Sequence, residues 1–195
     1  GDRPEEYPAL NLSFQKRGAA FRESFDYIRQ MGESSPAFEN TFGIPNGGID
    51  MLPKPTSGKL PLLITGGSQQ DPEWIARNGD GWMTYPRNTG VQERIIRDWR
   101  ARVEAVGGSD KPMMQPLYVD LTEDPDTQPQ PIHLGFRLGV NHLRDYLKSL
   151  EQIGMNHVAL NLRFNQADIE TTLKRLADNI LPDFAVQTFH ETSLH

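Results

Sequence analysis

The chain has 195 residues and a formal net charge of −6 at pH 7. Its Lys and Arg residues form no cluster, which argues against nucleic acid or an anionic membrane as a partner. It contains no cysteine, so disulfides, thiolate metal ligands and a cysteine nucleophile are excluded. No stretch approaches the ~20 apolar residues of a membrane span, and the N-terminal region lacks a signal-peptide core. These features predict one cytoplasmic domain over residues 1–195.

The N-terminal part of the chain predicts one helix followed by a long irregular segment. Ser13 is placed to cap the helix, its apolar side chains recur at helical spacing as far as Met31, and Gly32 is placed to end it. Residues 33–59 are rich in Ser, Pro, Gly and Asn. A segment of that length without regular structure is unusual in a compact domain, so we expect an irregular insertion that is functional or packs on its own.

Four strand-then-helix units follow in series. The predicted strands are residues 60–65, 81–85, 113–121 and 157–162. The first strand is a continuous apolar run, typical of a parallel strand covered on both faces. Asp71, Thr89 and Asn141 are placed to begin three of the helices, and the fourth is predicted over residues 169–180.

This order of elements predicts an α/β fold with parallel strands. The polar, proline-rich residues 122–139 are expected to connect the third strand to its helix, and residues 187–195 form a polar, frayed tail. A TIM barrel has eight βα units and about 250 residues. The chain is therefore either a small open sheet or the second half of a barrel.

The segment Gly66-Gly67-Ser68-Gln69-Gln70 lies between the first strand and its helix. Ligands of parallel βα arrays bind at the carboxyl ends of the strands. Glycine lets backbone N–H groups approach a ligand closely, and a helix N-terminus favours anions. The pattern fits a phosphate-binding turn and fits equally well a tight βα turn without a ligand. It matches neither the P-loop nor the G-x-G-x-x-G motif.

Other polar side chains follow the later strands. Tyr85 ends the second strand, His133 and Arg137 follow the third, and Asn161 and Arg163 flank the end of the fourth. Histidine can transfer a proton or orient a substrate, and arginine can bind a phosphate or carboxylate. The alternatives are a solvated loop histidine and surface salt bridges. No histidine–carboxylate group has metal-ligand spacing, so we expect no metal site.

A set of ordered motifs resembles the bacterial luciferase-like family of flavin-dependent monooxygenases. The resemblance covers essentially the whole chain, and the ordered set is more specific than any one motif alone. The motifs are Gly1-Asp2-Arg3-Pro4 with Glu5-Glu6-Tyr7-Pro8-Ala9, Phe14 to Ile28, Leu62 to Ser68, Gly79-Asp80-Gly81-Trp82, Pro131 to Gly135, and Gly154 to Leu162.

The resemblance implies a (β/α)₈ barrel, typically dimeric, that uses FMN or a deazaflavin. Reduced flavin in this family commonly reacts with oxygen to oxidise a small organic substrate, and NAD(P)H is a possible reductant. The first predicted strand would then be barrel strand five and the last would be strand eight. The turn from Gly66 to Gln70, with Arg3, would hold the flavin phosphate. The substrate side would carry Tyr85, His133, Arg137, Asn161 and Arg163.

The chain departs from the family pattern because barrel strands one to four have no counterpart in it. A half-barrel has two free strand edges and an unfilled inner face, both of which favour association. We therefore expect a homo-oligomer, or pairing with an amino-terminal half. Two alternatives to an active enzyme are a non-catalytic flavin-binding or assembly module and an inactive fragment of the parent enzyme.

Overall fold

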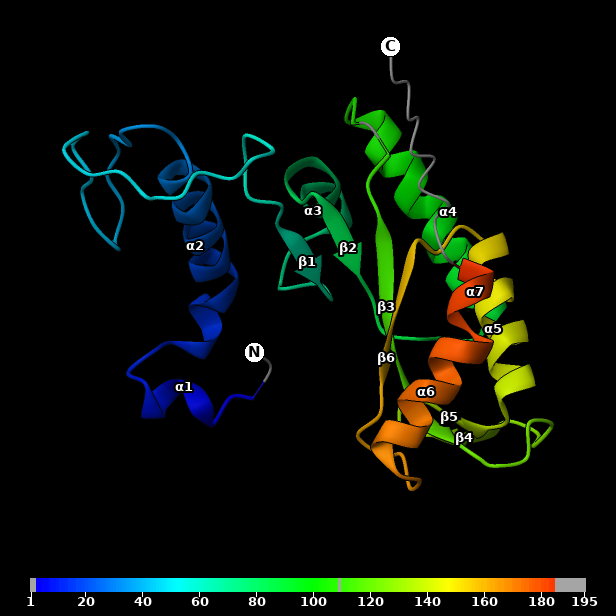
Figure 1. Cartoon of the computed structure of the whole chain (residues 1–195). Helices are drawn as coiled ribbons and strands as arrows, with labels where there is room; N and C mark the ends of the chain where they lie inside the picture. The colour runs from blue at the N-terminus through cyan, green and yellow to red at the C-terminus, as the bar shows by residue number, and fades with distance from the viewer. Residues whose placement is uncertain (1–2, 109, 185–195) are drawn as a thin grey trace, which may run out of the picture. The chain divides into compact units, whose positions relative to one another are not determined.

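The computed structural model describes residues 3–108 and 110–184 (Figure 1). The chain divides into two compact units. The first consists of Gly1–Met83 and Asp98–Pro112, and the second of Thr84–Arg97 and Met113–His195. The predicted tail at residues 187–195 lies outside the described residues. A single domain over residues 1–195 stays a prediction.

The first unit contains two parallel strands and several helices. Its elements are α1 (Glu6–Ala9), η1 (Phe14–Lys16), α2 (Arg17–Met31), β1 (Leu63–Thr65), α3 (Pro72–Asn78) and β2 (Gly81–Met83). It also holds the last part of α4 (Thr89–Ala105), whose first part belongs to the second unit. Ile64 of β1 lies opposite Trp82 of β2 in the parallel register.

Helix starts were predicted with mixed success. Asp71 caps α3 as predicted, because its Oδ1 accepts the backbone N–H of Trp74 at 2.7 Å. Ser13 is the N-cap residue of the 3₁₀ turn η1, which leads directly into α2, but its side chain makes no capping hydrogen bond. The predicted cap at Thr89 is wrong, because Asn88 precedes the helix and its Oδ1 accepts from Val91 N–H at 3.0 Å. Asparagine is at least as good a cap as threonine.

Strand β1 is shorter than the strand expected over residues 60–65. Pro61 has no backbone N–H to donate to a neighbouring strand, which disfavours pairing at that end. The expectation that this strand is covered on both faces is also wrong. Ile64 is 2% exposed, whereas the side chain of Leu63 is 40% exposed and Thr65 is exposed as well.

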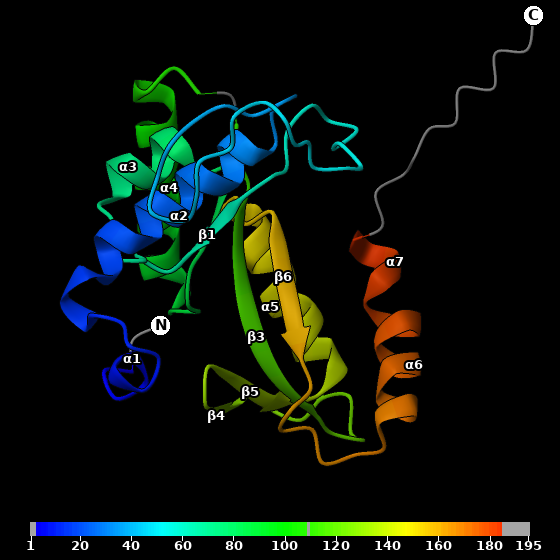
Figure 2. The same cartoon turned by 90° about the vertical axis from the view of Figure 1, so that its left-hand side faces the viewer.

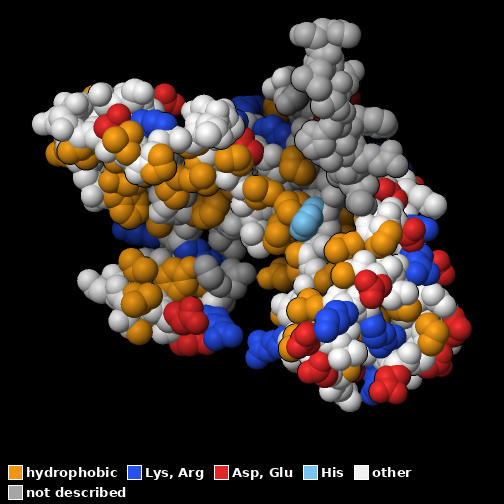
Figure 3. Space-filling view, in the orientation of Figure 1, with side chains coloured by type: hydrophobic (Ala, Val, Ile, Leu, Met, Phe, Trp, Pro, Cys, Tyr) orange, Lys and Arg blue, Asp and Glu red, His pale blue; other side chains and the backbone are white. Residues whose placement is uncertain are grey.

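The segment from residue 33 to 59 is irregular, as predicted, with only two isolated β-bridges. Tyr27 of α2 anchors part of it, since its ring lies 5.5 Å from that of Phe38 and 5.4 Å from that of Phe42. Several apolar side chains of the segment remain exposed, among them Ile44 and Leu52. Figure 3 shows hydrophobic side chains gathered on this segment.

The second unit is built around one long strand. Its elements after α4 are β3 (Met113–Leu121), β4 (Gln130–Ile132), β5 (Gly135–Leu138), α5 (Val140–Gln152), β6 (His157–Asn161), α6 (Ile169–Asn179) and α7 (Leu181–Phe184). Both β5 and β6 pair with β3 in parallel, and β4 pairs with β5 in antiparallel fashion.

The connection predicted over residues 122–139 is wrong in part, because it contains the β4–β5 hairpin (Figure 2). Both strands are too short for a hydrophobic period to reveal them. In the sequence, Pro131 argues against a strand at this position. In the structure it lies inside β4, which pairs only with β5 among the described strands. Proline is tolerated in such an edge strand.

The core of the second unit lies between β3 and the helices. Alternate residues of β3 point to one face, as expected for a strand, and α5, α6 and α7 lie on one side of β3 and β6 (Figure 1). The buried cluster comprises Leu117, Val119, Leu121, Leu138, Val140, Leu143, Leu147, Leu176 and Ile180. The other face of β3 is left free to carry polar and aromatic side chains.

Candidate functional site

The turn between β1 and α3 presents unpaired backbone N–H groups. Gly66 is tied into the sheet, because its N–H donates to Met83 at 2.8 Å and its carbonyl accepts from Trp82 Nε1 at 2.8 Å. The next three N–H groups, of Gly67, Ser68 and Gln69, make no hydrogen bond within the part of the chain that the structure describes. They are therefore available to an anionic ligand.

The backbone of this turn is held in an uncommon conformation. Gly66, Ser68 and Gln69 have φ values of +59°, +47° and +59°. Glycine adopts this left-handed region freely, whereas serine and glutamine do so at a cost in energy. The Ser68 hydroxyl donates to the Thr65 carbonyl at 3.0 Å, which helps to hold the turn. Residues in such conformations are often found at binding sites.

The Gln70 side chain points into the protein and holds the turn against α2. Its Nε2 donates to the carbonyls of Ser68 and Gly18, each at 2.9 Å, and its Oε1 accepts from Arg22 Nε. A Cβ atom on Gly18 would lie 3.0 Å from the Gln69 Cβ, so glycine permits this close approach. The Gln70 side chain therefore positions the turn, and the open donors are backbone groups.

The start of α3 does not add a free anion site. The Asp71 carboxylate already occupies it by accepting from Trp74 N–H. That hydrogen bond lowers the pKa of Asp71, so the carboxylate is ionised at neutral pH. Arg3, predicted to assist at the turn, is highly exposed and forms an ion pair with Glu6 at 3.5 Å. No described contact joins Arg3 to the turn.

The second unit carries an aromatic cluster on the face of β3 opposite its core. The ring of Tyr118 lies 5.8 Å from that of His133 and 5.0 Å from that of Phe164. His133 belongs to the β4–β5 turn, and Phe164 follows β6. Asn161 lies opposite Tyr118 in the β3–β6 register, so both residues share this face.

A polar cavity of about 340 Å³ lies near the carboxyl end of β3. Asp120, which is 4% exposed, lines it together with Arg137 and Gln166. The Asp120 Oδ1 accepts from Gln166 N–H at 3.0 Å, and its Oδ2 lies 3.6 Å from Arg137 Nε. This ion pair is loose, so the half-exposed guanidinium of Arg137 retains donors for a ligand.

The remaining predicted residues have weaker links to the site. The Asn161 side chain accepts from Arg163 N–H at 2.9 Å and so shapes the chain after β6. The Arg163 guanidinium lies 5.8 Å from the centre of the Phe164 ring. Tyr85 belongs to the second unit and is 54% exposed. The second unit thus gathers His133, Arg137, Asn161 and Arg163 near the carboxyl ends of β3 and β6.

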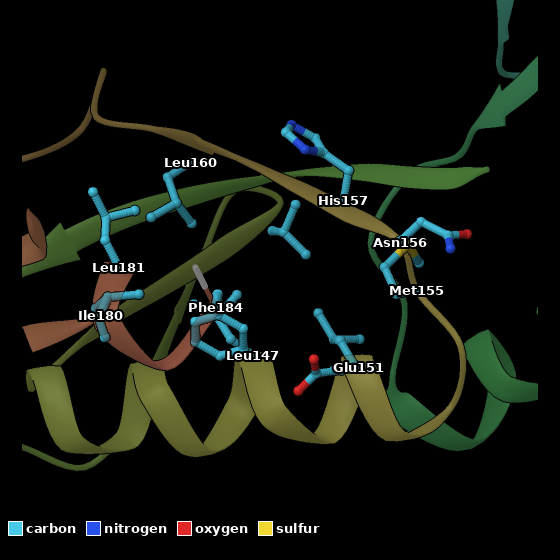
Figure 4. A pocket seen from close by; sticks show the side chains of 11 residues that line it. Leu147, Glu151, Met155, Asn156, His157, Leu160, Ile180, Leu181 and Phe184 are labelled. Atoms are coloured by element: carbon cyan, nitrogen blue, oxygen red, sulfur yellow. The ribbon is translucent and has the colours of Figure 1, made fainter. Parts of the chain in front are cut away.

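A second cavity, of about 510 Å³, lies between β6, α5 and α7 (Figure 4). Its lining is mostly apolar, with Leu147, Leu160 and Phe184 among the side chains that face it. His157 points away from α5 in Figure 4, as the alternation along a strand requires. Because the lining of this cavity is mostly apolar, we do not place catalysis there.

Sequence reasoning missed several residues of these sites. The period of two along residues 113–121 could have placed Tyr118 and Asp120 on the face opposite the core. No local signal links Arg22 to Gln70, because the two residues are 48 positions apart. Within residues 3–108 and 110–184, no group of three His, Cys, Asp or Glu side chains is arranged to bind a metal. None of the described helices is long and apolar enough to cross a membrane.

These features define an α/β protein with mainly parallel strands and polar groups at strand ends. Residues 1–128 match the family model for luciferase-like monooxygenases, and the chain belongs to this family. It is also 29% identical over 90 residues to the uncharacterized protein Rv0953c of Mycobacterium tuberculosis strain H37Rv. That match covers 44% of this chain and 32% of the relative.

Solved structures share the fold at low sequence identity. The monooxygenase RslO1 from Streptomyces bottropensis matches with a TM-score of 0.73 and 18% identity, over 93% of this chain and 66% of that chain. The EDTA monooxygenase EmoA from Chelativorans sp. BNC1 matches with a TM-score of 0.71 and 11% identity, over 94% of this chain and 65% of that chain. A coenzyme F420-dependent tetrahydromethanopterin reductase from Methanopyrus kandleri matches with a TM-score of 0.63 and 10% identity, over 86% of this chain and 63% of that chain. The chain thus spans less than two thirds of each of these structures.

Proposed function

We propose that the chain is part of a flavin-dependent monooxygenase that oxidises a small organic substrate with molecular oxygen. Membership of the luciferase-like monooxygenase family supports an oxidoreductase of this kind. The single observation that carries the proposal further is the turn from Gly66 to Gln69, with three unpaired N–H groups at the end of a parallel strand. NAD(P)H is the proposed source of electrons for the flavin.

The turn fits the phosphate of FMN. Two glycines leave it uncrowded, because a Cβ on Gly66 would meet nothing within 4 Å and one on Gly67 only a carbonyl at 4.0 Å. Backbone N–H groups without a protein acceptor can donate to phosphate oxygens, and no full positive charge has to be buried for this. The bound flavin supplies the redox chemistry, and the residues of this chain bind and orient it. A deazaflavin, as in the F420-dependent neighbour, is the alternative cofactor.

The substrate is proposed to bind at the aromatic and polar face of the second unit. Tyr118, His133 and Phe164 offer ring surfaces to an organic molecule. Arg137 and Arg163 offer donors to its polar groups, and Tyr85 and Asn161 belong to the same unit. The half-barrel assignment, with β1 as strand five and β6 as strand eight, is part of this proposal.

We also propose that the chain works in an assembly, either as a homo-oligomer or paired with an amino-terminal half. Among the described strands, β6 pairs only with β3. Its His157-Val158-Ala159-Leu160-Asn161 sequence carries no Lys, Pro or bulge to protect a free edge. Sedimentation of the purified chain tests this, and a stable monomer with full activity would contradict it.

A pair of substitutions at Ser68 tests the cofactor proposal. Ser68→Gly keeps the N–H and favours the positive φ, so FMN affinity should be retained. Ser68→Leu places a large side chain at the turn and strains it, and FMN affinity should fall about tenfold or more. Flavin fluorescence titration measures both. Equal affinity of the two variants would remove the turn from the phosphate site.

A non-catalytic flavin-binding or assembly module is the second candidate, favoured by the free edge of β6, which pairs only with β3 among the described strands. Bound flavin with NAD(P)H-dependent oxygen consumption would support the enzyme. Bound flavin without oxygen consumption would support the module. Absence of flavin binding would indicate an inactive fragment.

A further inference from the structure

Tyr118, Asp120 and Arg137 share one face of the second unit, where β5 lies beside the carboxyl end of β3 (Figure 2). Tyr118 and Asp120 are two residues apart on β3, so their side chains point to the same face about 6.6 Å apart along the strand. Arg137 lies opposite Asp120 in the parallel register, and the ion pair between them confirms the shared face. Gly135 lies opposite Tyr118, so β5 places no side chain between the Tyr118 ring and Arg137.

The Asp120 carboxylate holds one edge of the Arg137 guanidinium. Its Oδ2 lies 3.6 Å from Arg137 Nε, and its Oδ1 is occupied by the Gln166 N–H at 3.0 Å. The two terminal amino groups of Arg137 have no hydrogen-bond partner within residues 3–108 and 110–184. The Arg137 side chain is 44% exposed and lines the cavity of about 340 Å³. Its outer edge is therefore oriented and open to a ligand.

An open aromatic surface lies beside this guanidinium. The Tyr118 ring packs against Phe164 and His133, and the rings of His133 and Phe164 lie 6.3 Å apart in an edge-to-face arrangement. Phe164 is 41% exposed and His133 is exposed as well. Exposed rings in such a cluster offer faces and edges to a further aromatic ring.

The charges around the cavity favour a ligand with a single negative charge. Arg137 supplies a planar guanidinium, whose fork of donors matches the two oxygens of a carboxylate. Asp120 and Glu123 also line the cavity, and their carboxylates repel a doubly charged phosphate more than a carboxylate. The Arg163 guanidinium, 5.8 Å from the centre of the Phe164 ring, adds a second positive charge at the aromatic end.

We infer that the substrate of this chain is an aromatic carboxylic acid. Its ring would pack on Tyr118 and Phe164, and its carboxylate would accept from the terminal amino groups of Arg137. The inference rests on the proposed function, because it names the class of substrate that binds at this face of the second unit. Arg137 is then the residue that selects an acid over a neutral molecule of the same shape.

The test is isothermal titration calorimetry of the full chain with three matched probes. The probes are 3-phenylpropanoate, its neutral amide, and 3-cyclohexylpropanoate, which keeps the charge and lacks the aromatic ring. The parent chain should bind the phenyl acid about tenfold more tightly than the amide, and more tightly than the cyclohexyl acid. Arg137→Gln should abolish the preference for the acid and leave the amide affinity unchanged. Arg137→Lys should recover part of that preference.

A second variant does not disturb the buried Asp120 carboxylate. Glu123 is exposed, so Glu123→Gln should fold normally. It removes a negative charge from the cavity lining, and affinity for the phenyl acid should rise about two- to fivefold with no change for the amide.

Lys174→Gln is the matched control for the loss of one positive charge. Lys174 lies on α6, is 71% exposed, and pairs with Glu170 at 3.0 Å. It does not line the cavity, so the affinities for all three probes should stay the same.

Three results would overturn the inference. Equal affinity of the parent chain for the phenyl acid and its amide would remove the anion site. Equal affinity for the phenyl and cyclohexyl acids would remove the aromatic requirement. Equal loss of acid and amide binding in Arg137→Gln would mean that Arg137 only maintains the fold.

FMN binding to the same preparations separates this inference from the proposed function. FMN bound without any preference for the acid would overturn the inference and leave the proposed function standing. Preference for the acid without FMN binding would overturn the proposed function and support the aromatic-acid site.

Discussion

Arg29 of α2 donates to the carboxylate of Asp80, although the two residues are 51 positions apart in the chain. Lys59 and the backbone N–H of Leu62 donate to the same carboxylate. Burial by itself would raise the pKa of Asp80, but these hydrogen bonds outweigh it and lower the pKa to about 2. The pair fixes α2 to the strands that carry the candidate phosphate turn.

The Asp80 network predicts a defined pH dependence. A carboxyl group whose pKa is lower in the folded state stabilises it fully above the unfolded pKa of about 3.9, and this contribution is lost as the pH falls towards 2. Asp80→Asn should lower the free energy of unfolding by about 1–3 kcal/mol at pH 7. The difference between parent and variant should shrink between about pH 4 and pH 2.

Urea unfolding at a series of pH values measures this difference. Glu73→Gln is the control, because Glu73 forms an exposed ion pair with Arg77 and should contribute less than about 1 kcal/mol. A pH-independent difference for Asp80→Asn would show that its carboxylate does not titrate in this range.

Gly135 should not tolerate any side chain. A Cβ atom there would lie 1.8 Å from the Tyr118 carbonyl oxygen, where β5 enters the sheet beside β3. Gly135→Ala should therefore destabilise the chain by about 3 kcal/mol or more, or prevent folding. Gly90→Ala is the control on α4, where a Cβ atom would meet only Asn88 Oδ1, at 4.0 Å, and it should be neutral or slightly stabilising. Thermal unfolding followed by circular dichroism distinguishes the two, and equal stability would contradict the β3–β5 register.

The core of the second unit depends on Leu117. Its side chain is 0% exposed and belongs to the cluster between β3 and the helices. Leu117→Ala should cost about 2–5 kcal/mol in the free energy of unfolding, because it removes buried methyl groups and leaves a cavity. Leu173→Ala, at a side chain that is 53% exposed, should cost much less. Chemical denaturation of both variants provides the measurement, and similar losses would place the core elsewhere.

The Asp120 carboxylate stabilises the segment after β6. Its Oδ1 accepts from the backbone N–H of Gln166. Because Asp120 is buried, removing its carboxylate would leave this N–H without an acceptor, which is costly. Asp120→Ala should lower the free energy of unfolding by about 1–3 kcal/mol. Asp120→Asn retains an oxygen acceptor and should lose less. If both variants lose equally, the ion pair with Arg137 contributes more than the hydrogen bond to Gln166.

Much of the element order could be predicted because it depends on local patterns. Strand β3 was predicted with its observed limits, since nine consecutive residues combine apolar alternation with a preceding glycine-rich stop. The cap at Asp71 was also predictable from the Asp-Pro pair alone. The β4–β5 hairpin was not, because strands of three and four residues are stable only through pairing with β3. Its residues carry no apolar alternation long enough to predict either strand.

The sequence by itself determined the series of βα units, the glycine turn and the resemblance to a family, since each is written in contiguous residues. Only the tertiary structure decided which side chains meet at the turn and which carbonyls and carboxylates they use. Arg22 reaches Gln70 across 48 positions, and Arg29 reaches Asp80 across 51. Such contacts depend on how helix α2 packs beside β1 and α3, and that packing is set by side-chain shape and close backbone approach at Gly18, which no local pattern encodes.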